Sequence, residues 1–277
     1  MENPFVTTDW LATHLGDPNL IVIDGSWFLP TANRKPHEEY LAGHIPGAVF
    51  FDIDGIADTS QNLPHMLLAP DAFAAAVGAL GIGDGMTLVT YDEAGLFSAP
   101  RVWWEFSVMG APDIRILEGG GPKWRAEGRP LESGPSKRQP ATFTPKFNPG
   151  LVRDFDQVKA ALAAHVTVAD ARPAGRFAGR DPEPRPGTKS GHMPGAVSLP
   201  ALTLVIDGRM KPVSELQPMF EAAGVDWGKP VITTCGSGVT ASTLMLALKL
   251  AGAEDVAVYD GSWAEWGVRD DAVVVKD

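Results

Sequence analysis

Short apolar runs alternate with longer segments in which apolar residues recur at helical spacing along most of this chain. Runs of four or five largely β-branched or aliphatic residues predict strands, and the stretches between them predict helices. The predicted strands cover residues 20–24, 48–51, 87–91, 114–117, 166–170, 196–199, 231–234 and 256–259. This alternation is typical of an α/β fold with mostly parallel sheets flanked by helices.

The same short sequence appears in both parts of the chain. Gly43-His-Ile-Pro-Gly-Ala-Val49 and Gly191-His-Met-Pro-Gly-Ala-Val197 agree at six of seven positions and lie 148 residues apart. The strand that ends in Asp24 has a counterpart that ends in Asp170, at a similar separation. Repeated similarity at one spacing indicates a tandem duplication.

The duplication predicts two domains, residues 1–128 and 151–277. Between them, residues 129–150 contain five prolines in a polar setting, which is typical of a linker. Aligning the repeats places Asp92 opposite Cys235, so the first domain lacks the only cysteine of the protein. We expect the first domain to supply one wall of a binding cleft.

Cys235 lies in the predicted turn between strand 231–234 and an apolar helix. Gly236 and Gly238 allow the backbone to curl so that successive N–H groups point inward, and the helix N-terminus adds partial positive charge. Such a nest favours a thiolate. A lone cysteine is otherwise often packed as a small hydrophobe, but the flanking glycines favour a reactive one.

The net charge is −11, which argues against a nucleic-acid partner or an anionic membrane partner. The N-terminal residues have no basic segment followed by an apolar one, and no run of 18 apolar residues occurs. We therefore predict a cytoplasmic protein that does not bind membranes. With one cysteine, an internal disulfide is excluded. Neither a metal nor a cofactor is expected.

Two other kinds of anion-binding loop fit part of the sequence after Cys235. A phosphatase-type loop would need an arginine six positions after the cysteine, but residue 241 is alanine, so the charge clamp is missing. Residues 236–241 also satisfy the dinucleotide-binding fingerprint. Only 17 residues follow Asp260, however, which is too few to complete the sheet of that fold.

The loop Cys235-Gly-Ser-Gly-Val-Thr-Ala241 resembles the active-site loop of the two-domain rhodanese superfamily, in its 3-mercaptopyruvate sulfurtransferase branch. The thiosulfate-preferring branch tends to carry basic residues at the two positions after the cysteine, where this chain has Gly236 and Ser237. Further segments resemble family motifs, so the resemblance covers nearly the whole chain: 24–27, 43–47, 51–54, 98–104, 175–177, 183–185 and 259–266.

The resemblance implies two rhodanese-like domains and a sulfurtransferase. Cys235 would take sulfur from 3-mercaptopyruvate, a 2-oxo acid thiol, release pyruvate, and pass the persulfide sulfur to cyanide or a thiol. The thiol would be a low-molecular-weight compound or a thioredoxin-type protein. The loop N–H groups that would hold the sulfur anion belong to Gly236, Gly238, Val239 and Thr240 among others. Thiosulfate as donor, or a persulfide carrier or scaffold without turnover, remains an alternative.

The resemblance also assigns roles outside the loop. Arg176 and Arg185 match the family's two substrate-binding arginines, and a bidentate guanidinium suits a 2-oxo acid. Ser237 would handle protons together with His65 and Asp54 from the first domain. From the residues alone, the arginines could also be solvated surface charges, His65 an exposed loop histidine and Asp54 a turn-forming aspartate.

Overall fold

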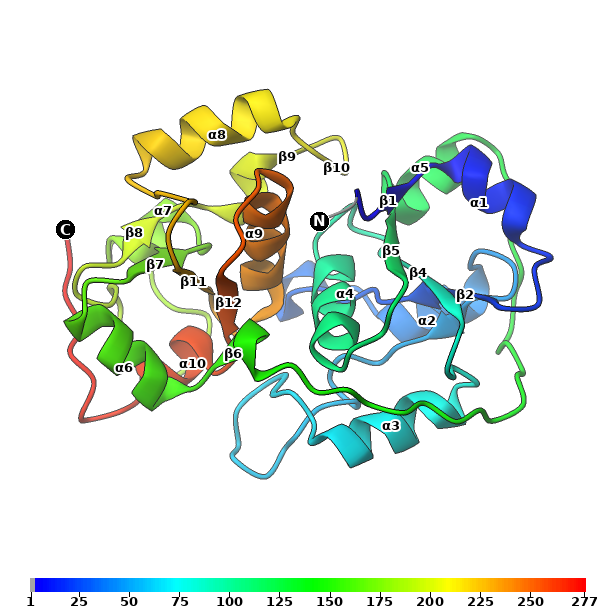
Figure 1. The fold of residues 1–277 in the computed structure, drawn as a ribbon, viewed down its shortest axis with the longest axis horizontal. Coiled ribbons are helices and arrows are strands. Elements are labelled where there is room, and N and C mark those ends of the chain that lie inside the picture. Colours follow the sequence, from blue (N-terminus) through cyan, green and yellow to red (C-terminus); the bar gives the residue numbers. More distant parts are fainter. Residues whose placement is uncertain (1–2) are drawn as a thin grey trace.

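The structure is a computed structural model that describes residues 3–277 as two α/β halves lying side by side (Figure 1). The first half contains β1 (Phe5–Val6), α1 (Thr8–His14), β2 (Leu20–Asp24), η1 (Pro30–Ala32), α2 (Pro36–Ala42), β3 (Val49–Phe50), α3 (Pro70–Ala79), β4 (Thr87–Tyr91), α4 (Ala99–Val108), β5 (Ile114–Leu117) and α5 (Gly120–Ala126). The second half contains η2 (Pro149–Leu151), β6 (Val152–Arg153), α6 (Phe155–Ala163), β7 (Thr167–Asp170), α7 (Ala174–Phe177), β8 (Val197–Ser198), η3 (Ala201–Leu204), β9 (Val205–Ile206), β10 (Arg209–Met210), α8 (Val213–Ala222), β11 (Val231–Thr234), α9 (Val239–Leu250), β12 (Val256–Tyr259) and α10 (Ser262–Trp266).

Each half is built on a five-stranded parallel sheet, and the two sheets have equivalent strand orders, β1-β5-β4-β2-β3 and β6-β12-β11-β7-β8. Asp24 pairs with Tyr91 in the first sheet, and Asp170 pairs with Thr234 in the second. The predicted α/β fold and its duplication are therefore confirmed. The antiparallel pair β9-β10 belongs to the second half and was not predicted.

Helices cover both faces of each sheet. In β2, Ile21 and Ile23 join the core that includes residues of α3 and α4, whereas Leu20 and Val22 join a separate core that includes Trp124 of α5. Successive strand residues point to opposite faces, so this alternation places apolar layers on both sides of the sheet. It explains why the central strands are almost continuously apolar in sequence.

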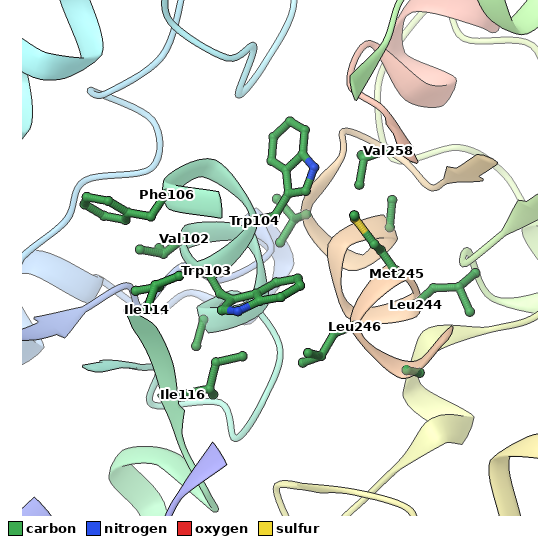
Figure 2. Packing of buried hydrophobic residues seen from close by; sticks show 14 of the residues in the cluster. Val102, Trp103, Trp104, Phe106, Ile114, Ile116, Leu244, Met245, Leu246 and Val258 are labelled. Atoms are coloured by element: carbon green, nitrogen blue, oxygen red, sulfur yellow. The ribbon is translucent and has the colours of Figure 1, made fainter. Parts of the chain in front are cut away.

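The two halves are joined through α4 and α9, which lie next to each other between the sheets (Figures 1 and 2). Both helices are buried on nearly all sides, because each packs against its own sheet and against the other helix. One core cluster therefore runs from Val102 and Trp103 in the first half to Leu246 in the second. Although α9 is largely buried, no helix within residues 3–277 is long and apolar enough to span a bilayer.

Residues 129–150 run along the outside of the first half before entering β6 (Figure 1). Their backbone is fastened there, since Ala141 N–H donates to Gly78 O at 2.9 Å and Asn148 N–H donates to Val108 O at 2.7 Å. Phe143 is buried in the core next to Phe73. This segment thus forms part of the packed surface of the first half.

Candidate active site

Cys235 occupies the turn between β11 and α9 and is 2% exposed. Gly238 is the N-cap residue of α9 and has a φ of 81°. Glycine suits this position because residues with a Cβ are strained at such a positive φ. The segment that begins α10 holds the turn from outside. Cys235 N–H donates to Ser262 Oγ at 3.2 Å, and Trp263 N–H donates to Cys235 O at 2.9 Å.

The loop after Cys235 presents backbone donors that the protein does not use. Within residues 3–277, the N–H groups of residues 236–240 have no hydrogen-bond acceptor in the protein. They lie at the N-terminus of the 12-residue helix α9, where the helix dipole favours negative charge. The loop can therefore hold an anion at or next to the cysteine sulfur.

The equivalent loop of the first half is already filled by a carboxylate. Asp92, which follows β4 as Cys235 follows β11, uses its two oxygens to accept four backbone N–H groups at 2.8–2.9 Å, those of Ala94, Phe97, Ser98 and Ala99. The duplicated turn is thus an anion nest in both halves. In the first half, the group that accepts these hydrogen bonds is a side chain of the protein itself, the carboxylate of Asp92.

Both predicted arginines lie beside the cysteine loop. A methyl group placed on Gly236 would lie 3.4 Å from Arg176 Nη2 and 3.9 Å from Arg185 Nη1. Arg185 Nη1 also donates a long hydrogen bond of 3.5 Å to Gly236 O. Burial lowers the pKa of Arg185, and the nearby Cys235 opposes that shift. The two guanidinium groups thus lie next to the cysteine loop.

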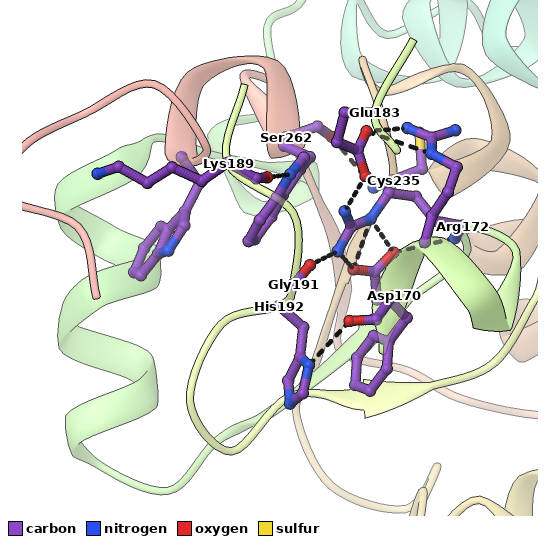
Figure 3. A network of polar contacts seen from close by, with 12 residues as sticks. Asp170, Arg172, Glu183, Lys189, Gly191, His192, Cys235 and Ser262 are labelled. Carbon is purple, nitrogen blue, oxygen red and sulfur yellow. Dashed lines mark hydrogen bonds and ion pairs between the residues drawn. The ribbon is translucent and has the colours of Figure 1, made fainter. Parts of the chain in front are cut away.

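A network of charged residues holds Arg176 in place. Arg176 pairs with Glu183, and the other oxygen of Glu183 accepts from Arg172 Nη1 at 2.8 Å. Arg172 is buried between Glu183 and Asp170 and lies over the ring of Trp263 at 4.0 Å (Figure 3). Arg176 is therefore prepositioned by charge pairing.

The first half contributes a hydrogen-bonded chain that ends at the cysteine loop. Asp54 Oδ1 lies 2.8 Å from His65 Nε2, and His65 Nδ1 lies 3.0 Å from Ser237 Oγ. An ionised Asp54 accepts the proton of Nε2, which leaves the Nδ1 lone pair to accept the Ser237 hydroxyl proton. The residues predicted from the two halves, Asp54, His65, Ser237 and Cys235, are thus brought together.

Trp27 contacts both His65 and Asp54 and so holds the two side chains in their relative positions. The ring is buried and packs edge-on against Trp27, with centroids 4.8 Å apart. Trp27 Nε1 also donates to both oxygens of Asp54 at 3.1 Å. The hydrogen bond from His65 lowers the pKa of Asp54, which keeps this carboxylate ionised at neutral pH.

Several residues around the site carried no role in the sequence analysis. Ser262 holds the cysteine turn, Trp27 holds Asp54, and Glu183 and Arg172 hold Arg176. A signal for two of them was present, because Asp-Gly-Ser-Trp occurs at both 24–27 and 260–263.

A cavity of about 600 Å³ lies between the halves, at the hairpin of β9 and β10. Within residues 3–277, none of the predicted site residues lines it; the lining residues are 94, 95, 119, 122, 123, 126 and 206–209. In the first half, His65 contacts the cysteine loop and Asp54 and Trp27 lie behind it, and none of these three residues lines the cavity.

Comparison with known proteins identifies the family. The rhodanese-like domain family matches residues 7–127 and 154–268. The 3-mercaptopyruvate sulfurtransferase of Escherichia coli K12 is 44% identical over 274 residues, 98% of this chain and 97% of that protein. The thiosulfate sulfurtransferase of Bos taurus is 43% identical over 270 residues, 94% of this chain and 91% of that protein.

The fold comparison agrees with these matches. A crystal structure of SseA from Escherichia coli, described as a 3-mercaptopyruvate sulfotransferase with the rhodanese fold, superposes with a TM-score of 0.87 at 42% identity. It covers 95% of this chain and 100% of that chain. The predicted family is confirmed, and the chain belongs to the two-domain rhodanese superfamily, in the branch that holds the 3-mercaptopyruvate sulfurtransferases.

Proposed function

We propose that this protein is a sulfurtransferase that moves sulfur from 3-mercaptopyruvate through a Cys235 persulfide to a thiol or cyanide acceptor, with release of pyruvate. The observation that carries the proposal is the chain from Asp54 through His65 to Ser237, which reaches the loop of the only cysteine at 2.8 and 3.0 Å. Relatives named for this activity span nearly the whole chain.

Substrate binding is assigned to Arg176 and Arg185. The carboxylate and keto oxygens of a 2-oxo acid present two acceptors in one plane, which a guanidinium fork matches. Both arginines lie beside Gly236, so a donor bound to them has its thiol next to the cysteine sulfur.

In the first step, the Cys235 thiolate attacks the thiol sulfur of the donor. A sulfur–sulfur bond forms, the carbon–sulfur bond breaks, and the electron pair leaves with the three-carbon fragment as the enolate of pyruvate. The unpartnered N–H groups of residues 236–240 would stabilise the anionic sulfur of the persulfide.

The enolate needs a proton on carbon to become pyruvate, and the donor thiol supplies one. Ser237 is placed to pass this proton, because His65 Nδ1 accepts from its hydroxyl group at 3.0 Å. Asp54 would stabilise the imidazolium that forms for the duration of the transfer. Transfer from thiosulfate would not need this proton relay, because sulfite leaves without protonation. The relay therefore favours 3-mercaptopyruvate as the donor.

In the second step, a thiolate or cyanide attacks the outer persulfide sulfur and Cys235 leaves as a thiolate. We assign the acceptor role to a low-molecular-weight thiol or a thioredoxin-type protein and keep the cytoplasm as the predicted location. The absence of a second cysteine means that no internal thiol competes for the persulfide sulfur.

Steady-state kinetics with cyanide as acceptor test the choice of donor. We expect a higher kcat/KM with 3-mercaptopyruvate than with thiosulfate. A higher value with thiosulfate would reverse the donor assignment. If neither donor places sulfur on Cys235, the catalytic proposal as a whole fails and a scaffold role is favoured.

A further inference from the structure

A buried arginine of the first half connects α4 to the proposed proton relay. Arg101 lies in the first turn of α4 and is fully buried. Its Nη2 donates to the backbone oxygen of His65, and its Nη1 donates to Asp260 Oδ1 at 2.7 Å. The Nε atom donates to Glu105 Oε1 at 2.6 Å, four residues along the same helix. Arg101 therefore contacts both halves and the histidine backbone.

The second half holds the same loop at another point. Asp260, directly after β12, uses its second oxygen to accept from Leu67 N–H at 2.7 Å. The segment from His65 to Leu67 is thus attached to Asp260 twice, once directly and once through Arg101. These bonds cross the interface between the halves.

The backbone of His65 needs such support. Its φ is +61°, in the left-handed region that residues with a Cβ seldom adopt. A residue keeps this conformation only where surrounding contacts hold it, and the bond from Arg101 to the His65 carbonyl is one of them. The conformation directs the imidazole between Asp54 and Ser237.

The guanidinium of Arg101 also lies against the cysteine loop. A methyl group placed on Gly238 would lie 2.6 Å from Arg101 Nη1, so glycine at this position leaves the space that the arginine occupies. Arg101 thus contacts both the loop that carries Ser237 and the backbone of His65, whose ring is hydrogen-bonded to Ser237.

We propose that Arg101 is a positioning residue for the relay, holding His65 so that its ring spans Asp54 and Ser237. This inference rests on the proposed function. The arginine contacts no substrate and acts on the relay through His65.

The test compares Arg101→Lys with the wild type, alone and in a His65→Ala background. Lysine keeps the charge but lacks the fork that serves the His65, Asp260 and Glu105 acceptors together. With 3-mercaptopyruvate as donor, we expect Arg101→Lys to lower kcat about tenfold or more while KM stays within about twofold. In the His65→Ala background the same substitution should cause no further loss of kcat.

Val102→Ala is the matched control, because it removes buried volume from the same helix without touching the relay. We expect it to lower the melting temperature and leave kcat unchanged. If Arg101→Lys does not fold, Asp260→Asn, which weakens the attachment of Arg101 and Leu67, replaces it with the same expectations.

Wild-type kcat in the folded variant would overturn the inference, as would an equal loss of kcat with and without His65. Failure of the proposed function is distinguishable, because the wild type itself would then not turn over 3-mercaptopyruvate.

Discussion

At the residue scale, the two arginines beside the cysteine loop differ in their partners. Arg176 is paired with Glu183, whereas Arg185 has no carboxylate partner among residues 3–277 and makes only a long bond to Gly236 O. Partial burial of the Arg185 guanidinium lowers its pKa. A substrate carboxylate would supply the missing partner.

Arg185→Lys should therefore weaken donor binding more than it slows chemistry. The charge remains but the bidentate fork is lost, and a charge-assisted hydrogen bond contributes about 1.5–3 kcal/mol. We expect KM for 3-mercaptopyruvate to rise about tenfold or more while kcat changes little. Arg180→Lys is the control, since Arg180 is exposed in the same loop and should leave KM unchanged. An unchanged KM in Arg185→Lys would remove Arg185 from the binding site.

Asp24 gives a prediction for the pH dependence of stability. Burial raises its pKa to about 6, and this desolvation outweighs the hydrogen bonds from Ser26 and from Tyr91, whose hydroxyl lies 2.8 Å from Asp24 Oδ2. Because the pKa is higher in the folded than in the unfolded chain, the folded state binds more protons between about pH 4 and pH 6. Stability contributed by the neutral carboxyl is present below this range and is lost as pH rises through it.

The loss amounts to about 3 kcal/mol across the window, from about 1.4 kcal/mol per pKa unit. Asp24→Asn cannot ionise, so its free energy of unfolding should fall less than that of the wild type between pH 4 and pH 7. Urea denaturation at a series of pH values measures both slopes. Equal slopes would show that Asp24 does not titrate in this range.

At the element scale, the duplicated strand-turn-helix unit presents backbone N–H donors in both halves. In the first half the carboxylate of Asp92 accepts four backbone N–H groups, and in the second the corresponding turn carries Cys235 and unpartnered donors. One unit thus serves stability in the first half and is available for chemistry in the second.

Asp92→Ala should destabilise the protein, because it leaves those N–H groups buried without an acceptor. We expect a loss of about 3–5 kcal/mol in the free energy of unfolding, since each bond to a charged group contributes about 1.5–3 kcal/mol and the bonds are not additive. Asp92→Asn keeps one oxygen and should lose less. A change below about 0.5 kcal/mol in Asp92→Ala would mean that water replaces the carboxylate.

The elements that could be predicted from sequence are those whose residues are buried on both faces. Strands such as β2 and β11 are buried along their whole length, and their bounds match the prediction. β1 and β6 are two residues long and depend on pairing with distant strands, as Phe5 does with Ile116, so no local pattern marks them.

In the candidate site, too, local features could be predicted from sequence and long-range contacts could not. The turn at Cys235 follows from local glycines, whereas His65 and Ser237 meet across 172 positions. Only the family resemblance assigned His65 and Asp54 a role, because residue types alone leave a loop histidine and a turn aspartate open. No local pattern marks Arg101, because its partners are the His65 carbonyl, 36 positions away, and Asp260 in the second half.

At the scale of the whole molecule, the apolar core passes from one half to the other through α4 and α9. Trp103 and Leu246 belong to one cluster of buried residues, and Trp104 Nε1 donates to Leu151 O at 3.0 Å in the second half. Separating the halves would expose this surface to water. The relay, which also crosses the interface, therefore depends on the same packing.

We expect the two halves to unfold in one cooperative transition. Far-ultraviolet circular dichroism and tryptophan fluorescence should give coincident urea curves. Leu246→Ala, which removes a fully buried side chain at the interface, should shift that single transition by about 2–5 kcal/mol. Val268→Ala is a matched control at a half-exposed position and should have little effect. Two separated transitions in the wild type would contradict a shared core.

The central claim is that Cys235 accepts sulfur from 3-mercaptopyruvate. Intact-mass spectrometry after incubation with this donor, without an acceptor, tests it most directly. The wild type should gain the mass of one sulfur atom and release one pyruvate per chain, whereas Cys235→Ser should gain nothing. An unmodified wild type, or sulfur added to Cys235→Ser, would contradict the account.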